Sequence, residues 1–158
     1  MLLSPIQGKP VLTQGFGLNP KTYAQFGLKG HNGLDFRAPV GTPLFSPFEG
    51  VVSVTDSGGT GYGLHVKIRC NVKGKEKEAV LGHFSRMDVK TGDTVSMGQQ
   101  LGLSGNSGFS TGPHLHFGFR FLLPGTGSIW TWPVKDAGNG FAGYVDQTKY
   151  LLTWDNFK

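Results

Sequence analysis

Residues 114–121, with the sequence His-Leu-His-Phe-Gly-Phe-Arg-Phe, alternate between large apolar side chains and small or polar ones. Successive side chains of an extended strand point to opposite faces, so this alternation predicts a strand with one face in the core. The core-facing side would carry four large apolar residues: Leu115, Phe117, Phe119 and Phe121. His114 and His116 would lie next to each other on the opposite face. Two histidines on one rigid element indicate a functional site, whose kind depends on what the rest of the chain contributes.

The composition favours a sheet protein. The 158 residues include 26 glycines and 9 prolines, which suit short strands joined by turns and leave little room for helices. No helical pattern extends beyond two turns. We therefore expect an all-β fold with little helix. We expect a single domain over residues 1–158, because no linker or internal repeat divides the chain.

Cysteine content and charge narrow the classes of function. Cys70 is the only cysteine, which excludes an intrachain disulfide and a cysteine-based zinc site, so a metal would need histidines and carboxylates. The net charge of +5 suits a polyanionic partner such as nucleic acid, an anionic membrane or a bacterial wall. The basic residues are scattered and form no stripe interleaved with aromatic residues, so we expect no nucleic-acid partner.

The first ten residues do not have the pattern of a signal peptide. Residues 1–10 lack a basic region followed by a long apolar segment, and no apolar run in the chain is long enough to span a membrane. We therefore expect no membrane insertion. The sequence fits a protein that is exported by other means, or a mature fragment of a secreted protein.

The glycine-bounded segment around His31 contains a nearby carboxylate. Gly30 and Gly33 argue against a helix there, so we expect a turn followed by a strand that begins near Leu34. Asp35 can then approach His31 only if the turn folds back.

The other histidines lie on expected strands. His83 should share a strand face with Ala79 and Leu81, because the three residues are two apart. By the same alternation, we expect His65 to be a solvent-facing strand residue. The charged run at residues 73–78 mixes lysines and glutamates, and we expect it to form a solvated hairpin loop.

Several of these residues can be combined into one candidate centre: His31, Asp35, His83, His114 and His116. A catalytic zinc takes three protein ligands and keeps one position open for water, whose pKa it lowers towards ~7. Two histidines and one aspartate would supply these three ligands. Two further histidines could transfer protons or stabilise the charge that develops in the transition state. Residue types alone leave two alternatives open: ordinary loop and turn residues without a metal, and a non-haem iron site built from two histidines and one carboxylate.

Three separated motifs occur in a fixed order. The first is Gly-His-Asn-Gly-Leu-Asp-Phe at 30–36, followed by Ala-Pro-Val-Gly-Thr-Pro at 38–43. The second is Gly-His-Phe at 82–84, and the third is Gly-Asn-Ser-Gly-Phe-Ser-Thr-Gly-Pro-His-Leu-His-Phe at 105–117. Together with the turn-rich stretch at 89–102, they resemble the M23 metallopeptidases, the lysostaphin and LytM-like family.

This resemblance covers residues 11–121, which would form the core of the domain, with residues 122–158 as a loop-rich C-terminal extension packed on that core. It implies a LytM/lysostaphin-like fold of the barrel-sandwich-hybrid type, a mostly antiparallel twisted sheet with a narrow substrate groove. It implies that His31, Asp35 and His116 ligate one Zn²⁺ ion, and that His83 and His114 act on the bound water and the transition state. The implied reaction is hydrolysis of the peptide bridges of bacterial peptidoglycan, whose stems and bridges would be the partners of a monomeric enzyme. The alternative is a LytM-like module that binds the wall without cleaving it. Such modules typically lack one or more ligands, whereas all five positions are filled here.

The chain departs from the family pattern at two positions. Leu81 stands where members often carry an aromatic residue, and Gly118 where they often carry an acidic one. The departures bear on substrate preference, so a glycine bridge and a direct D-Ala-to-diaminopimelate link both stay open. Residues 144–151 resemble the closing segment of some phage-borne members, which suggests a phage lysin or virion-associated lysin that acts on the cell wall. We expect Trp130 and Trp132 to pack their own loop rather than shape the groove.

Overall fold

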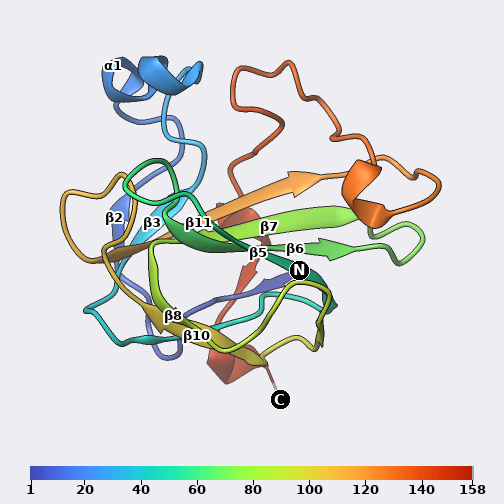
Figure 1. The fold of residues 1–158 in the computed structure, drawn as a ribbon, viewed down its shortest axis with the longest axis horizontal. Helices are drawn as coiled ribbons and strands as arrows, with labels where there is room; N and C mark the ends of the chain where they lie inside the picture. The colour runs from blue at the N-terminus through green and yellow to red at the C-terminus, as the bar shows by residue number, and fades with distance from the viewer. Residues whose placement is uncertain (158) are drawn as a thin grey trace.

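The computed structural model describes residues 1–157 and consists mainly of antiparallel strands (Figure 1). The largest sheet has seven strands in the order β2-β3-β11-β7-β6-β5-β9. In that order their bounds are Leu12–Gln14, Leu34–Arg37, His114–Phe121, Lys77–Gly82, Leu64–Cys70, Gly50–Asp56 and Thr94–Val95. Every neighbouring pair in this sheet is antiparallel. The all-β, mostly antiparallel fold expected from the sequence is confirmed.

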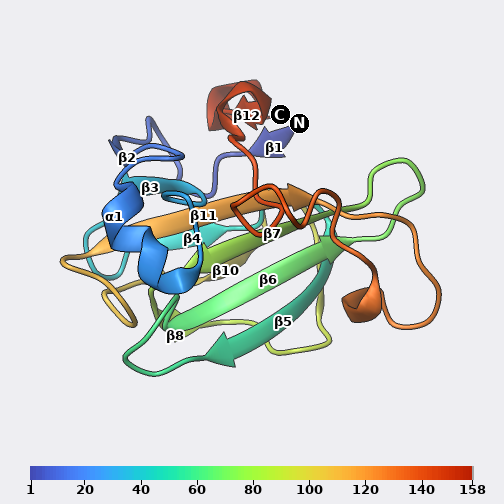
Figure 2. The ribbon, with the colours of Figure 1, turned by 90° about the horizontal axis from the view of Figure 1, so that it is seen from above.

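A second sheet forms the other layer of the core. Its three strands are ordered β4-β10-β8 and span Pro43–Phe45, Gln100–Ser104 and Phe84–Met87. Figures 1 and 2 show β8 and β10 on one side of the large sheet. Apolar side chains from both sheets fill the space between them, among them Phe36, Leu81, Leu115 and Phe117 from the large sheet and Leu44, Phe84 and Leu101 from the small one. The opposite face of the large sheet is therefore left for polar groups.

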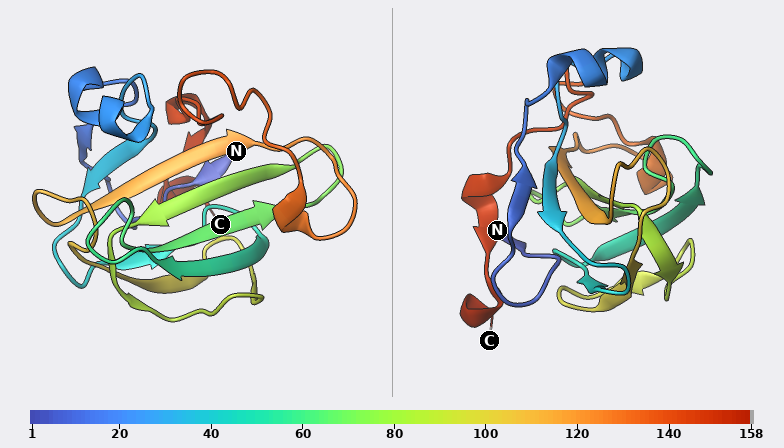
Figure 3. Two further views of the ribbon diagram at one scale, coloured as in Figure 1. Left: turned by 45° about the horizontal axis from the view of Figure 1, so that its top comes forward. Right: turned by 90° about the vertical axis from the view of Figure 1, so that its left-hand side faces the viewer.

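The helical segments are short. They are α1 (Pro20–Tyr23), η1 (Ala24–Phe26), η2 (Ile129–Thr131), η3 (Thr148–Tyr150) and η4 (Trp154–Asn156). Figure 3 shows α1 and η2 near opposite ends of the long strand β11. Within residues 1–157, no helix is long and apolar enough to cross a membrane.

Strands near the two ends of the chain lie side by side (Figure 2). Strand β1 (Leu2–Leu3) pairs in parallel with β12 (Leu151–Leu152). The indole nitrogen of Trp154 donates to the carbonyl oxygen of Ser4 over 3.0 Å. Leu2 belongs to the main apolar cluster, so segments outside residues 11–121 also contribute to the core.

His65 is buried, and its predicted exposure to solvent was wrong. Only 8% of its surface is exposed. The ring packs edge-on against Tyr62, with 5.4 Å between centroids, and Nδ1 donates to the carbonyl oxygen of Gly63 over 2.8 Å. Strand alternation placed His65 on the correct face, but the turn before β6 folds back and covers that face locally.

The charged run at 73–78 is not entirely a solvated loop. Strand β7 begins at Lys77, and Glu78 is fully buried between Arg69 and Arg120. The prediction of a solvated loop was wrong for Glu78. Its partners lie on the two neighbouring strands, β6 and β11, which a local sequence pattern does not report. The preceding residues, 73–75, are exposed as expected.

Candidate metal centre

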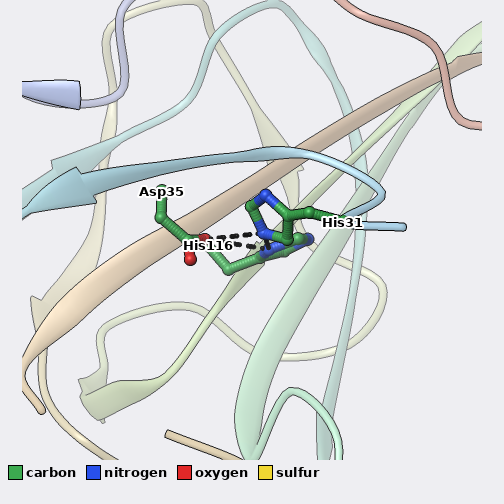
Figure 4. A group of neighbouring side chains, drawn as sticks. All are labelled: His31, Asp35 and His116. Atoms are coloured by element: carbon green, nitrogen blue, oxygen red, sulfur yellow. Dashed lines mark hydrogen bonds and ion pairs between the residues drawn. The ribbon is translucent and has the colours of Figure 1, made fainter. Parts of the chain in front are cut away.

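Three side chains converge at one end of the polar face of the large sheet (Figure 4). His31 Nε2 lies 3.0 Å from Asp35 Oδ1 and 3.0 Å from His116 Nδ1. His116 Nδ1 lies 3.2 Å from Asp35 Oδ1. All three residues are buried. The structure thus brings together the three residues that were expected to hold a metal.

The backbone explains why residues so far apart in sequence meet. Antiparallel pairing of β3 with β11 sets Asp35 directly opposite His116. His31 precedes β3 and is held by two backbone hydrogen bonds, to Gly17 and to Leu18. The turn between His31 and Asp35 packs directly against β11, because a Cβ atom at Gly33 would lie 2.6 Å from the Phe117 carbonyl oxygen. The 3.0 Å between His31 Nε2 and Asp35 Oδ1 shows that the same turn folds back on itself. The fold-back on which the convergence of His31 and Asp35 depends is present.

The three converging atoms lack the hydrogen atoms needed to satisfy one another. His31 Nδ1 lies 3.0 Å from the Gly15 carbonyl oxygen, which only accepts, so Nδ1 carries the proton and Nε2 presents a lone pair. Asp35 Oδ1 is an acceptor, and a neutral His116 has one N–H to offer at most. His116 Nε2 is itself buried without a hydrogen-bond partner among the described residues. Such a shortage of donors around buried acceptors is resolved by a cation.

The triangle also has the dimensions of a metal site. Zn–N and Zn–O bonds of ~2.0–2.1 Å in a tetrahedral arrangement separate ligand atoms by roughly 3.3 Å. The separations of 3.0–3.2 Å found here are close to that value. Two imidazole nitrogens and one carboxylate oxygen form a donor set that first-row divalent metals accept.

Protonation states in the cluster favour the ligating forms. Burial alone would raise the pKa of Asp35, but the neighbouring His116 and His31 rings outweigh the effect of burial and hold this pKa well below its usual range. Burial lowers the pKa of His116. The aspartate is therefore ionised and the imidazole neutral at pH 7, as metal binding requires.

His83 and His114 lie beside the triangle with their rings 4.6 Å apart. His83 Nδ1 donates to the Ser107 carbonyl oxygen over 2.6 Å, and His114 Nδ1 to that of Gly112 over 2.8 Å. In the neutral form, each ring therefore presents a lone pair at Nε2. His114 Nε2 is 3.5 Å from Asp35 Oδ2. Burial lowers the pKa of His83 to about 4, so its imidazole is neutral at pH 7.

His83 reaches this position by a backbone route that differs from the prediction. Strand β7 ends at Gly82, and His83 adopts a left-handed conformation with φ 64°. Ala79 and Leu81 point into the core, so the expectation that His83 shares their face was wrong. The positive φ of His83 turns the chain before β8. The His83 side chain therefore does not follow the alternation of faces along β7.

Further polar residues around the centre were not predicted as functional. Gln14 Nε2 donates to Asp35 Oδ2 over 3.0 Å and to Tyr23 Oη over 2.7 Å. The Tyr62 ring stacks on His116 with 5.0 Å between centroids, and its hydroxyl accepts a hydrogen bond from Asn32 over 2.9 Å. The only signal for Tyr62 was its position between two glycines in the turn before β6.

These residues line a groove of about 870 Å³. Its rims include two partly exposed aromatic side chains, Phe26 and Phe109, whose rings contact each other at 5.2 Å between centroids. Leu81 is fully buried in the core and does not line the groove. Trp130 and Trp132 also lie outside it, and Trp130 packs under the Arg69 guanidinium at 5.2 Å. The Trp loop is thus anchored on the sheet at a distance from the metal centre.

Comparison with known proteins agrees with this geometry. The sequence of residues 29–127 matches the profile of Peptidase family M23. The chain is 44% identical over 87 residues to the peptidoglycan DD-endopeptidase ShyA of Vibrio cholerae, a match that covers 55% of this chain and 19% of the relative. It is 37% identical over 106 residues to the glycyl-glycine endopeptidase ALE-1 of Staphylococcus capitis, which covers 66% of this chain and 28% of the relative.

Solved structures extend the match to nearly the whole chain. The crystal structure of a catalytic-domain mutant of the prophage-encoded M23 protein EnpA from Enterococcus faecalis superimposes with a TM-score of 0.63 and 34% identity. That match covers 90% of this chain and 93% of the EnpA domain. The curated relatives are longer proteins, and the matched region spans only about a fifth to a quarter of their length. Since the family profile covers well over half of the sequence, the chain belongs to peptidase family M23.

Proposed function

We propose that this protein is a zinc-dependent endopeptidase that hydrolyses peptide cross-bridges of bacterial peptidoglycan, with residues 1–158 acting as a single peptidase domain. The observation that carries the proposal is the buried triangle of His31, Asp35 and His116, which has too few hydrogen-bond donors. The triangle lies in a groove beside two more histidines, both fixed by backbone carbonyls. The named peptidoglycan and glycyl-glycine endopeptidases among its relatives support the substrate class.

In this proposal His31 Nε2, His116 Nδ1 and Asp35 Oδ1 hold one Zn²⁺ ion. When bound, the ion supplies Lewis acidity that polarises the scissile carbonyl and activates water at neutral pH. Gln14 keeps the second oxygen of Asp35 occupied, and Gly15 keeps the His31 ring in the tautomer that ligates. These contacts orient the ligands before the ion arrives, which is the usual role of groups behind a metal site.

His83 and His114 are proposed as the proton-transfer groups. In the neutral form of each ring, the single proton is the one that Nδ1 donates to a backbone carbonyl, so Nε2 can accept the proton of the attacking water. The resulting imidazolium can stabilise the developing oxyanion or donate its proton to the leaving amine. The hydrogen bonds to Ser107 and Gly112 fix the direction of both rings, so little reorganisation is needed during the reaction.

The proposed place of action is the bacterial cell wall. The net charge of +5 favours association with an anionic polymer. A phage-encoded lysin is the proposed origin, supported by the likeness to a prophage-encoded M23 domain over 90% of the chain. We propose a monomer as the active form, since all five residues of the centre come from one chain.

The test is hydrolysis of isolated cell walls by the purified protein. Loaded with zinc, it should clear wall suspensions and release new amino groups without new reducing sugar ends, which identifies peptide-bond cleavage. A chelator should stop the reaction and added Zn²⁺ should restore it. Metal analysis of the purified protein separates zinc from iron. Binding to walls without any chelator-sensitive release of amines would instead support the wall-binding module and reject the endopeptidase.

A further inference from the structure

Lys67 is a cation in the groove that has no partner. It lies on β6, on the same face of the large sheet as the metal centre, and it lines the groove. The side chain is half-buried, and within residues 1–157 its amino group makes no hydrogen bond or ion pair. Burial lowers the pKa of Lys67, because the charged amine loses part of its contact with water there. A partly desolvated ammonium group without a counter-ion is stabilised when an anion binds to it.

The nearest buried carboxylate is already fully used. Glu78 accepts from Arg69 Nε at Oε2 over 2.6 Å and from Arg120 Nε at Oε1 over 2.8 Å. Two guanidiniums around one carboxylate leave one positive charge in excess. Asp35 is the only carboxylate among the described residues that line the groove, and it faces the histidines. Among residues 1–157, no carboxylate is therefore left to pair with Lys67.

The sheet register relates Lys67 to the metal centre. Lys67 pairs with Val80, and Val80 pairs with Gly118, which is two residues beyond His116 on β11. Two strand spacings of ~4.8 Å put the Lys67 backbone about 10 Å from β11, a gap that an extended lysine side chain can largely bridge. No large side chain projects into the groove from Gly118, between Lys67 and the metal centre, because Gly118 carries no side chain. The Tyr144 ring lies directly against this glycine. A substrate that lies over the metal centre and extends along β11 would pass close to Lys67.

We propose that Lys67 is a specificity-determining residue that binds a carboxylate of the substrate next to the scissile bond. This inference rests on the proposed function. A stem-peptide cross-link between D-Ala and diaminopimelate carries such a carboxylate, because diaminopimelate keeps a free carboxyl group beside the linked amine. A glycine bridge is uncharged along its length. Lys67 therefore favours the stem-peptide link over a glycine bridge.

The test compares two probes that differ in one charge. Both are D-Ala–diaminopimelate cross-links made uncleavable by reducing the scissile carbonyl to CH₂; one keeps the free carboxyl group beside the link, and the other has it as a carboxamide. Binding to the zinc-loaded protein is measured by calorimetry. We expect the carboxylate probe to bind about tenfold tighter, the effect of one charge-assisted hydrogen bond. In Lys67→Met this ratio should fall to near one, and in Lys67→Arg much of it should return.

Lys90→Met is the matched control. Lys90 is exposed and does not line the groove, so the variant loses the same charge but should keep the wild-type ratio. Zinc content and thermal unfolding establish that Lys67→Met is folded. Equal binding of the two probes by the wild type, or an unchanged ratio in Lys67→Met, would overturn the inference.

Cleavage of the corresponding unreduced links separates this inference from the proposed function. If the wild type hydrolyses the carboxylate and carboxamide links at equal rates, and binds the two probes equally, the endopeptidase proposal holds and the role of Lys67 is rejected. If the wild type binds the carboxylate probe selectively through Lys67 but cleaves no link and no wall, carboxylate recognition holds and the endopeptidase proposal is rejected.

Discussion

The polar face of the large sheet contains two buried carboxylates with opposite surroundings. Asp35 lies on β3 and Glu78 on β7, on either side of β11. Both are strongly buried, with exposed fractions of 6% and 0%. Glu78 is surrounded by donors: Arg69, Arg120 and the hydroxyl of Tyr144. Asp35 instead faces ring nitrogen atoms of three histidines, of which His31 presents a lone pair, and it accepts one amide hydrogen bond, from Gln14.

The balance of donors and acceptors tells the two sites apart. Around Glu78 each carboxylate oxygen is satisfied by a group of the chain, so this cluster is complete and serves the structure. Around Asp35 the acceptors outnumber the donors, which is the basis for proposing that a bound cation completes this cluster. Burial and charge alone would not distinguish them, because both are buried carboxylates next to nitrogen-bearing side chains.

The largest expected effect is the loss of the metal centre in His116→Ala. Removing one of three ligands should reduce zinc content to the background level, measured by metal analysis. Peptidoglycan hydrolysis should fall by roughly 10³-fold or more, since Lewis-acid stabilisation of several kcal/mol is lost. If His116→Ala kept one zinc ion per chain, the interpretation of the Asp35 cluster as a metal centre would be wrong.

His114→Ala should separate chemistry from metal binding. His114 contacts Asp35 only through a 3.5 Å approach to Oδ2 and takes no part in the triangle. The variant should therefore retain zinc, while its turnover falls by about 10²–10⁴-fold, the usual contribution of a proton-transfer group. Full activity of a folded, zinc-loaded His114→Ala protein would remove His114 from the proposed mechanism.

Much of the centre could be predicted because its signals are local. The alternation at 114–121 predicted a strand, and β11 has those bounds. The glycines around His31 predicted a turn that is followed by a strand from Leu34. Short-range patterns of this kind report which face a side chain occupies and where the chain turns.

The rest depended on partners that sequence patterns do not report. The Glu78 cluster joins residues from three strands, and no local pattern distinguishes a buried glutamate from a solvated one at the end of a charged loop. The positive φ of His83 is rare for a residue other than glycine, so alternation assigned its side chain to the wrong face. The burial of His65 depends on the Tyr62 ring, which also stacks on His116.

Glu78→Gln tests the interpretation of the Glu78 cluster as structural. The substitution keeps the shape of the side chain but leaves two buried guanidiniums without a counter-charge, which typically costs about 3–5 kcal/mol. For a chain of this size that corresponds to a fall in the midpoint of thermal unfolding of roughly 10 °C. Arg69 and Arg120 also bond the Ile129 and Ala142 carbonyls, so the loops after β11 should loosen first.

The control for Glu78→Gln is Asp88→Asn. Asp88 pairs with Arg86 at the surface, where water and salt screen the pair and it contributes little to stability. Both variants should bind zinc like the wild type once folded at low temperature. If Glu78→Gln lost zinc at a temperature where the protein stays folded, the two carboxylate clusters would be coupled. The Glu78 cluster would then not be purely structural.

Gly33→Ala should produce a smaller, combined effect. The new methyl group would lie 2.7 Å from His116 Cε1 as well as close to the Phe117 carbonyl, so the His116 ring or the turn must shift. Crowding of this kind costs about 1–3 kcal/mol of stability. Displacement of a ligand should also weaken zinc affinity by about 10–100-fold, measured by competition with a chelator. Unchanged zinc affinity would mean that the His116 ring is not held by contact with this turn.

The smallest expected effect is that of His65→Ala, which tests whether the fifth histidine belongs to either cluster. His65 lies on the same sheet face as His116, and the Tyr62 ring packs between them. Its Nδ1 is used locally by the Gly63 carbonyl, and none of its atoms belongs to the triangle. Loss of one neutral hydrogen bond and some packing should lower stability by about 1 kcal/mol. Zinc content should be unchanged and hydrolysis should stay within about twofold of the wild type.

A larger loss of activity at full zinc content would contradict this prediction. It would show that the Tyr62 ring needs contact with His65 in order to hold the His116 ring in place. His65 would then count among the residues that support the metal centre.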